Sequence, residues 1–158
     1  MGRISPAYIV QDGVVPRTSL GAVLARIASL SAEAGIRVAN VFHAGDGNLH
    51  PLVLYDDKVP GQAEAAEEVS GAILDTCLEY GGSITGEHGV GVDKSRYMPK
   101  MFGTEDLDTM QLVRCAFDPA SLCNPGKVFP TPRLCGEVPG HRRAVHPAVS
   151  AGQAIEIF

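Results

Sequence analysis

The chain has 158 residues, of which 45% are hydrophobic, so it can bury one globular core and is not of the disordered class. Its formal net charge of −5 argues against a surface that binds nucleic acid. No apolar run is long enough to span a bilayer and no signal peptide opens the chain, which predicts a cytoplasmic protein. The four cysteines form no CxxC pair, and we expect all of them to be reduced thiols: Cys77, Cys115, Cys123 and Cys135.

The predicted elements alternate between strands and helices. Apolar residues at helical spacing predict helices capped by Thr18 or Ser19 and by Thr104, and Gly35 is placed to end the first of these. A short helix is expected after Asp93, which can cap it. In chain order we expect a strand over 8–15, a helix over 19–34, strands over 37–44 and 48–55, a helix over 62–80, a strand over 83–86, a short helix over 94–97 and a helix over 104–117.

The segment 40–51 predicts a β-hairpin that carries two histidines. Asp46-Gly47 between two apolar runs is a strong hairpin signal. A two-residue loop centred on this pair places His43 opposite His50, with Cβ atoms about 4.5–5.5 Å apart on one face of the sheet. This register brings two imidazoles together, as is needed to bind one metal ion.

A glycine-rich segment, 86–91, offers a carboxylate and a third imidazole. Two imidazoles and a carboxylate suit Zn²⁺, Mn²⁺ or Fe²⁺ and leave coordination positions open for a substrate. Glu87 and His88 are adjacent, so they share a site only if the chain turns there, which the flanking glycines permit. The alternative is that His43 and His50 lie on a solvated sheet face and that Glu87-His88 faces solvent in a turn.

Several polar residues are candidates for binding an anionic substrate or a flavin phosphate. The basic candidates are Arg17, Lys94, Arg96 and Lys127, and for each the alternative is a solvated side chain. Asn48 either satisfies amides of the turn or hydrogen-bonds a ligand. Neither glycine cluster has the spacing of a dinucleotide-binding or phosphate-binding loop.

The position of the hairpin among helices indicates the fold class. We expect an α+β fold in which helices pack on one face of an antiparallel or mixed sheet. From residue 131 onward, Pro, Gly, Arg and His dominate without periodicity, which predicts a surface-hugging or disordered tail over 131–158.

Three motifs in this order resemble one family. Residues 41–50 (VFHAGDGNLH), 81–91 (GGSITGEHGVG) and 117–127 (FDP followed by NPGK) are similar to the C-terminal part of FAD-linked 2-hydroxyacid oxidases and dehydrogenases of the vanillyl-alcohol oxidase superfamily. The resemblance covers about residues 7–140 and is nearest to the D subunits of bacterial glycolate oxidases. It implies that residues 1–130 are part of a C-terminal cap domain. It also implies that the FAD-binding domain is absent from this chain.

The resemblance also implies roles for individual residues. His43 and His50 match metal-ligand histidines, Glu87 matches a ligand carboxylate and His88 matches the general base. In such enzymes the metal binds the carboxylate and hydroxyl oxygens of the substrate, the base takes the hydroxyl proton, and a hydride passes to FAD. Arg17, Asn48 and Lys127 remain candidates for substrate or cofactor binding.

The implied activity is oxidation of glycolate to glyoxylate, with the flavin and iron–sulfur subunits of glycolate oxidase as partners at the periphery of the inner membrane. We expect the isolated chain to be inactive and to self-associate through exposed apolar surface. The alternatives are a D-lactate or D-2-hydroxyglutarate dehydrogenase fragment, or a non-catalytic metal- or partner-binding module. A non-haem iron oxygenase is a weaker alternative, because it does not explain the three ordered motifs.

Overall fold

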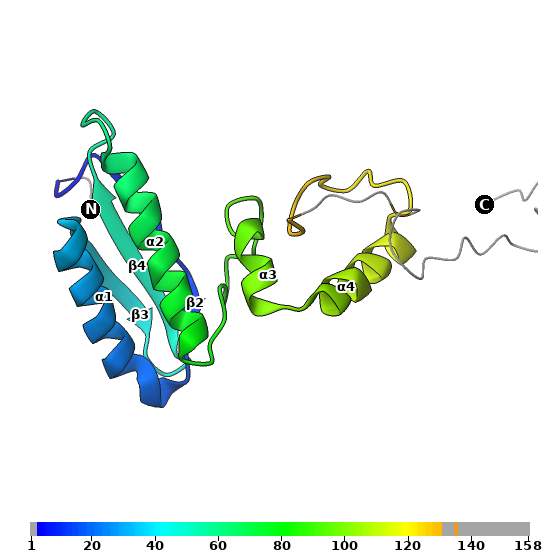
Figure 1. The fold of residues 1–158 in the computed structure, drawn as a ribbon, viewed down its shortest axis with the longest axis horizontal. Coiled ribbons are helices and arrows are strands. Elements are labelled where there is room, and N and C mark those ends of the chain that lie inside the picture. The colour runs from blue at the N-terminus through cyan, green and yellow to red at the C-terminus, as the bar shows by residue number, and fades with distance from the viewer. Residues whose placement is uncertain (1–2, 131–134, 136–158) are drawn as a thin grey trace, which may run out of the picture.

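The computed structural model describes residues 3–130 and residue 135. It has an α+β fold in which two helices cover one face of a four-stranded antiparallel sheet, as predicted (Figure 1). The elements are β1 (Ala7–Val10), β2 (Gly13–Val14), the 3-10 helix η1 (Arg17–Ser19), α1 (Leu20–Ala34), β3 (Val38–His43), β4 (Asn48–Tyr55), α2 (Gln62–Glu79), the 3-10 helix η2 (Ser95–Tyr97), α3 (Met98–Met101) and α4 (Thr104–Phe117).

Strand β4 is the centre of the sheet. It pairs with β3 along one edge and with β1 and then β2 along the other, and every pairing is antiparallel. The single strand predicted over 8–15 is wrong, because the chain leaves the ladder at Asp12 and β1 and β2 are separate strands. The interruption is local, since Gln11 N still donates to the Pro51 carbonyl at 3.0 Å.

The core lies between the sheet and helices α1 and α2, which pack side by side (Figure 1). Alternate β4 residues point to this core, and Leu49 and Val53 are fully buried there. Ile27 of α1 and Ile73 of α2 meet them with no exposed surface. The other β4 residues, including His50, consequently face the side of the sheet that these helices leave uncovered.

The predicted end of α1 is confirmed and its predicted cap is wrong. Gly35 adopts a left-handed conformation with φ +66° at the end of the helix. At the other end neither Thr18 nor Ser19 caps α1 with its side chain, because both lie in η1, which leads directly into the helix.

The hairpin has the predicted strands but not the predicted turn. The loop contains the four residues 44–47, so His43 pairs with Asn48 and Val41 pairs with His50. The amides of Asp46 and Gly47 both donate to the His43 carbonyl at 3.0 Å, which closes the longer turn. The predicted pairing of His43 with His50 is therefore wrong by two positions. Because side chains alternate with a period of two, both histidines still lie on the same face.

The segment after α2 is less regular than predicted. The expected strand over 83–86 is reduced to one bridge between Ser83 and Val14. Asp93 does not cap the short helix, because η2 begins after Lys94 and its end carries no side-chain hydrogen bond. Helix α4 begins at Thr104, but the capping contact comes from Asp106, whose Oδ2 accepts from Gly103 N at 3.1 Å. Figure 1 shows α4 extending away from the sheet.

The prediction of four reduced cysteines is wrong for two of them. Cys115 in α4 forms a disulfide with Cys135, and their Cα atoms are 5.5 Å apart. The two cysteines are 20 positions apart in the sequence, and no short cysteine motif pointed to this pairing. Cys77 and Cys123 are free thiols. Apart from Cys135, the predicted tail over 131–158 lies outside the described residues.

No helix within residues 3–130 is long and apolar enough to cross a membrane.

Candidate metal centre

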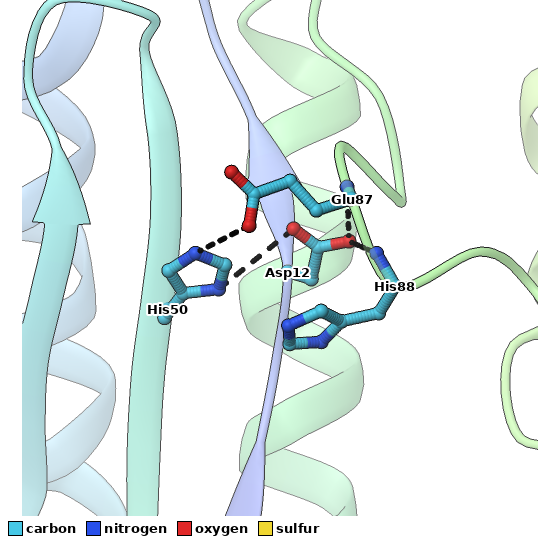
Figure 2. A group of neighbouring side chains, drawn as sticks. All are labelled: Asp12, His50, Glu87 and His88. Carbon is cyan, nitrogen blue, oxygen red and sulfur yellow. Dashed lines mark hydrogen bonds and ion pairs between the residues drawn. The ribbon is translucent and has the colours of Figure 1, made fainter.

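Three separate segments bring four ionisable side chains together on the face of the sheet that α1 and α2 leave uncovered. His50 comes from the middle of β4, Asp12 from the break between β1 and β2, and Glu87 and His88 from the loop that follows α2 (Figure 2). One potential ligand atom from each of these four residues lies within 4.8 Å of all the others. His43, at the end of β3, also lies next to Glu87, with its Nε2 3.7 Å from Glu87 Oε1.

Both carboxylate oxygens of Glu87 face an imidazole. Glu87 Oε1 lies 3.7 Å from His43 Nε2, and Glu87 Oε2 lies 3.5 Å from His50 Nε2. Two ligand atoms that each lie about 2.1 Å from a tetrahedral zinc ion are about 3.4 Å apart, so each of these two separations is compatible with an ion between Glu87 and the imidazole that it faces. His43 and Glu87 are about half exposed, which leaves the outer side of the site open to a substrate.

The imidazole rings are packed against one another. The His50 and His88 rings stack with centroids 5.0 Å apart and planes inclined by 19° (Figure 2), whereas His43 meets the edge of His50 at 5.3 Å. His88 is exposed, and one of its ring nitrogens belongs to the same group of potential ligand atoms as His50 and Glu87. An exposed imidazole in this position is suited to act as a general base.

Asp12 organises the loop that carries Glu87 and His88, and the sequence reasoning missed it. Its Oδ2 atom accepts hydrogen bonds from the backbone amides of Gly86, Glu87 and His88 at 2.9, 2.9 and 2.7 Å and from Thr85 Oγ1 at 2.8 Å. Burial of this fully enclosed carboxyl raises its pKa, but these four hydrogen bonds outweigh burial and hold the pKa below its usual range.

Lys94 supplies a buried positive charge beside this carboxylate. Its Nζ atom lies 3.9 Å from Asp12 Oδ2, and only 6% of the residue is exposed. Burial lowers the pKa of the Lys94 ammonium group, and the Asp12 carboxylate opposes that effect. Lys94 was a candidate for binding an anionic substrate, but the charge that it faces here is the Asp12 carboxylate of the same protein.

Asn48 and Gly86 complete the wall of the site. Asn48 is buried and its Nδ2 lies 3.5 Å from His50 Nε2, so it belongs to the cluster. The loop packs closely on it, because a Cβ atom added to Gly86 would lie 2.6 Å from Val14 Cγ2 and 3.0 Å from Asn48 Nδ2. Only glycine fits at position 86 without displacing these neighbours.

The other basic candidates lie outside the cluster. Arg17 is exposed in η1, and Arg96 pairs with Glu67 of α2 at 3.6 Å on an exposed surface. Lys127 is exposed in the segment after α4 and lines a separate hollow beside that helix. A hydrogen bond from Val128 N to the Gly91 carbonyl ties this segment to the loop of the site. The contacts described for Arg17 and Lys127 therefore do not join them to the histidines.

Comparison with known proteins gives a consistent family. Residues 1–128 match the family described as "FAD linked oxidases, C-terminal domain". The chain is 52% identical over 137 residues to the glycolate oxidase subunit GlcD of Escherichia coli (strain K12), a match that covers 87% of this chain and 28% of that protein. It is 37% identical over 129 residues to GlcD of Bacillus subtilis, covering 82% of this chain and 27% of that protein.

The chain is also similar to a protein that is named as a D-lactate dehydrogenase. The chain is 33% identical over 127 residues to the mitochondrial D-lactate dehydrogenase [cytochrome] of Arabidopsis thaliana, covering 80% of this chain and 22% of that protein. The chain thus spans only about a quarter of the length of these relatives. Since the family match extends over most of the chain, the protein belongs to the FAD-linked oxidases and corresponds to their C-terminal domain.

Proposed function

We propose that this chain supplies the metal- and substrate-binding part of the active site of an FAD-dependent 2-hydroxyacid oxidoreductase that converts glycolate to glyoxylate. The observation that carries the proposal is the convergence of His43, His50 and Glu87 at ligand separations, with His88 stacked beside them. In this proposal residues 1–130 form part of the cap domain, and residues 131–158 form a tail.

The proposed mechanism assigns one task to each side chain. His43 Nε2, His50 Nε2 and the Glu87 carboxylate hold a divalent ion, with Zn²⁺, Mn²⁺ or Fe²⁺ suited to this donor set. When bound, the ion supplies Lewis acidity and FAD supplies the hydride acceptor. His88 accepts the proton of the substrate hydroxyl, and its stacking on His50 fixes the imidazole beside the ligand set.

The choice of glycolate is supported by the relatives. The identity is 52% to a protein named as a glycolate oxidase subunit and 33% to one named as a D-lactate dehydrogenase. D-Lactate and D-2-hydroxyglutarate are therefore the alternative substrates. Because the relatives are named as subunits of a glycolate oxidase, we also propose that the enzyme works with further subunits. The motif resemblance implies that these are flavin and iron–sulfur subunits, and we propose a location in the cytoplasm at the inner membrane.

A metal titration tests the ligand set on the chain itself. We expect the isolated chain to bind one Co²⁺ or Zn²⁺ ion in calorimetry, and His43→Ala and Glu87→Ala each to abolish binding. Glu68→Ala is the matched control, because Glu68 is an exposed carboxylate on α2 away from the cluster. Metal content that survives both ligand substitutions would contradict the proposed site.

A hybrid enzyme tests the activity and the substrate. Residues 1–128 replace the matching segment of E. coli GlcD, and glycolate-dependent dye reduction is measured beside D-lactate and D-2-hydroxyglutarate. We expect glycolate to be the best substrate and His88→Gln to lower kcat by about 10²–10⁴-fold with FAD content unchanged. A hybrid that retains FAD and oxidises none of the three acids would favour the non-catalytic module, and a preference for another acid would correct the substrate.

A further inference from the structure

We propose that Asp12 is the positioning residue of this site, because one of its oxygens holds the loop of Glu87 and His88 while the other fixes the tautomer of His50. The assignment of His50 as a ligand rests on the proposed function. The arrangement of Asp12 itself is a property of the chain without metal.

The first oxygen, Oδ2, gathers the loop. Three consecutive amides, those of residues 86–88, point at this single atom together with Thr85 Oγ1. Successive backbone amides directed at one anion form a concave anion site, which here is filled by a side chain of the same protein. This contact turns the chain so that Glu87 and His88, although adjacent, both reach the cluster (Figure 2).

The second oxygen, Oδ1, faces His50. It lies 3.7 Å from His50 Nδ1, and both atoms are buried without another hydrogen-bond partner. This distance exceeds a hydrogen bond, but such contacts tighten when a ligand occupies a site. On the opposite side of the ring, Asn48 Nδ2 lies 3.5 Å from His50 Nε2. A carboxamide nitrogen only donates, so Asn48 and Asp12 both favour a proton on Nδ1. The Glu87 carboxylate, 3.5 Å from Nε2, acts in the opposite sense, but it is half exposed and screened by solvent, whereas the Asp12 carboxylate is fully buried and prevails.

That tautomer is the one the proposed ligand set requires. His50 Nε2 is the nitrogen directed at Glu87, and a metal binds the unprotonated nitrogen. Carboxylates that accept from the far nitrogen of a ligand imidazole fix both its tautomer and its orientation. Lys94 provides the counter-charge that this buried carboxylate needs, from a position only six residues beyond His88.

Replacing Asp12 by Asn reverses the tautomer. The carboxamide oxygen has to remain at the Oδ2 position, because three backbone donors point there. The NH₂ group then occupies the Oδ1 position and donates to His50 Nδ1, which moves the imidazole proton to Nε2. An aspartate-to-asparagine change beside a catalytic histidine of serine proteases produces the wrong tautomer in the same way.

The experiment is ¹⁵N NMR of the metal-free chain at pH 8, followed by Co²⁺ titration. We expect His50 of the wild type to carry its proton on Nδ1 and the amides of residues 86–88 to be protected from exchange. In Asp12→Asn we expect the proton on Nε2 and Co²⁺ affinity lowered about 10–100-fold. Asp118→Asn is the matched control, because Asp118 also accepts two backbone amides, those of Leu122 and Cys123, and should leave His50 unchanged.

The outcomes separate this inference from the proposed function. A wild-type His50 protonated on Nε2, unprotected amides at 86–88, or a tautomer that Asp12→Asn leaves unchanged would each overturn the role of Asp12. The wild-type spectrum decides even if the variant does not fold. A wild type with the expected tautomer that binds no Co²⁺ would defeat the metal site while leaving the positioning role of Asp12 in place.

Discussion

Among single residues, the buried thiol of Cys77 makes stability depend on alkaline pH. Burial raises the pKa of this thiol from 9.0 to about 11, and the nearby charge of Lys94 lowers it to a smaller extent. A pKa raised by folding contributes stability fully below the unfolded value, and that stability is lost as pH rises through the folded value. We expect the ionisation of Cys77 to lower the free energy of unfolding by about 2–3 kcal/mol as the pH rises from 9 to 11, and urea unfolding at a series of pH values measures this loss.

Cys77→Ala isolates this contribution from the other groups that titrate in the same range. The variant should be less stable than the wild type at pH 8, because it leaves a small cavity in the core. Its disadvantage should shrink toward pH 11, since only the wild type has to ionise a buried thiol. Cys123→Ala, at an exposed position, should follow the wild type at every pH. Parallel pH curves for wild type and Cys77→Ala would show that burial does not perturb this thiol.

The sequence located the ligand-type residues but not the residues that hold them. His43, His50, Glu87 and His88 stand in motifs, and the structure brings all four together. Asp12 was hidden within an expected strand, although aspartate is disfavoured in strands and its position next to Gly13 was the available signal. Lys94 pairs with Asp12 because the loop over 86–94 buries it, and no pattern in the sequence around Lys94 predicts that burial.

At the scale of elements, the hairpin shows what turn chemistry does and does not determine. Asp46-Gly47 correctly indicated where the chain reverses, and the bounds of β4 match the prediction. The longer loop makes a contact outside the hairpin, because Val15 N, in the segment after β2, donates to the Gly47 carbonyl at 2.9 Å. This contact after β2 was not visible in the hairpin sequence. The face of both histidines was still correct because the error was an even number of residues.

Gly47 is the residue that this turn depends on. It has φ +75°, and a Cβ atom added there would overlap the Val15 carbonyl. We expect Gly47→Ala to lower the free energy of unfolding by at least about 1–2 kcal/mol, the cost of a left-handed conformation alone. Gly45→Ala in the same turn is the control, because a Cβ atom there meets nothing within 4 Å. Urea unfolding that places both variants at the same stability would contradict this account.

At the scale of the whole molecule, helices cover only one side of the sheet in the described part of the chain. Periodicity predicted α1, α2 and α4 closely, because amphipathic spacing reports which face of a helix is buried. It carried no information on the Cys115–Cys135 pairing, which depends on how the segment after α4 returns to that helix. The side of the sheet without helices holds the cluster of His43, His50, Glu87 and His88 together with apolar side chains.

This uncovered face leads us to expect self-association of the isolated chain. Tyr8, Val10 and Val41 are 47%, 37% and 53% exposed, and the register places them on the same face as His50. Exposed apolar side chains gathered on one face favour association with another surface. We therefore expect the average mass in light scattering to rise with concentration and to fall toward the monomer in Tyr8→Ser/Val41→Ser. Phe117→Ser, at an 87% exposed position on α4, is the comparison, and it should leave the association unchanged. A wild type that stays monomeric at high concentration would contradict the expectation. An effect of Phe117→Ser alone would move the contact from the sheet to α4.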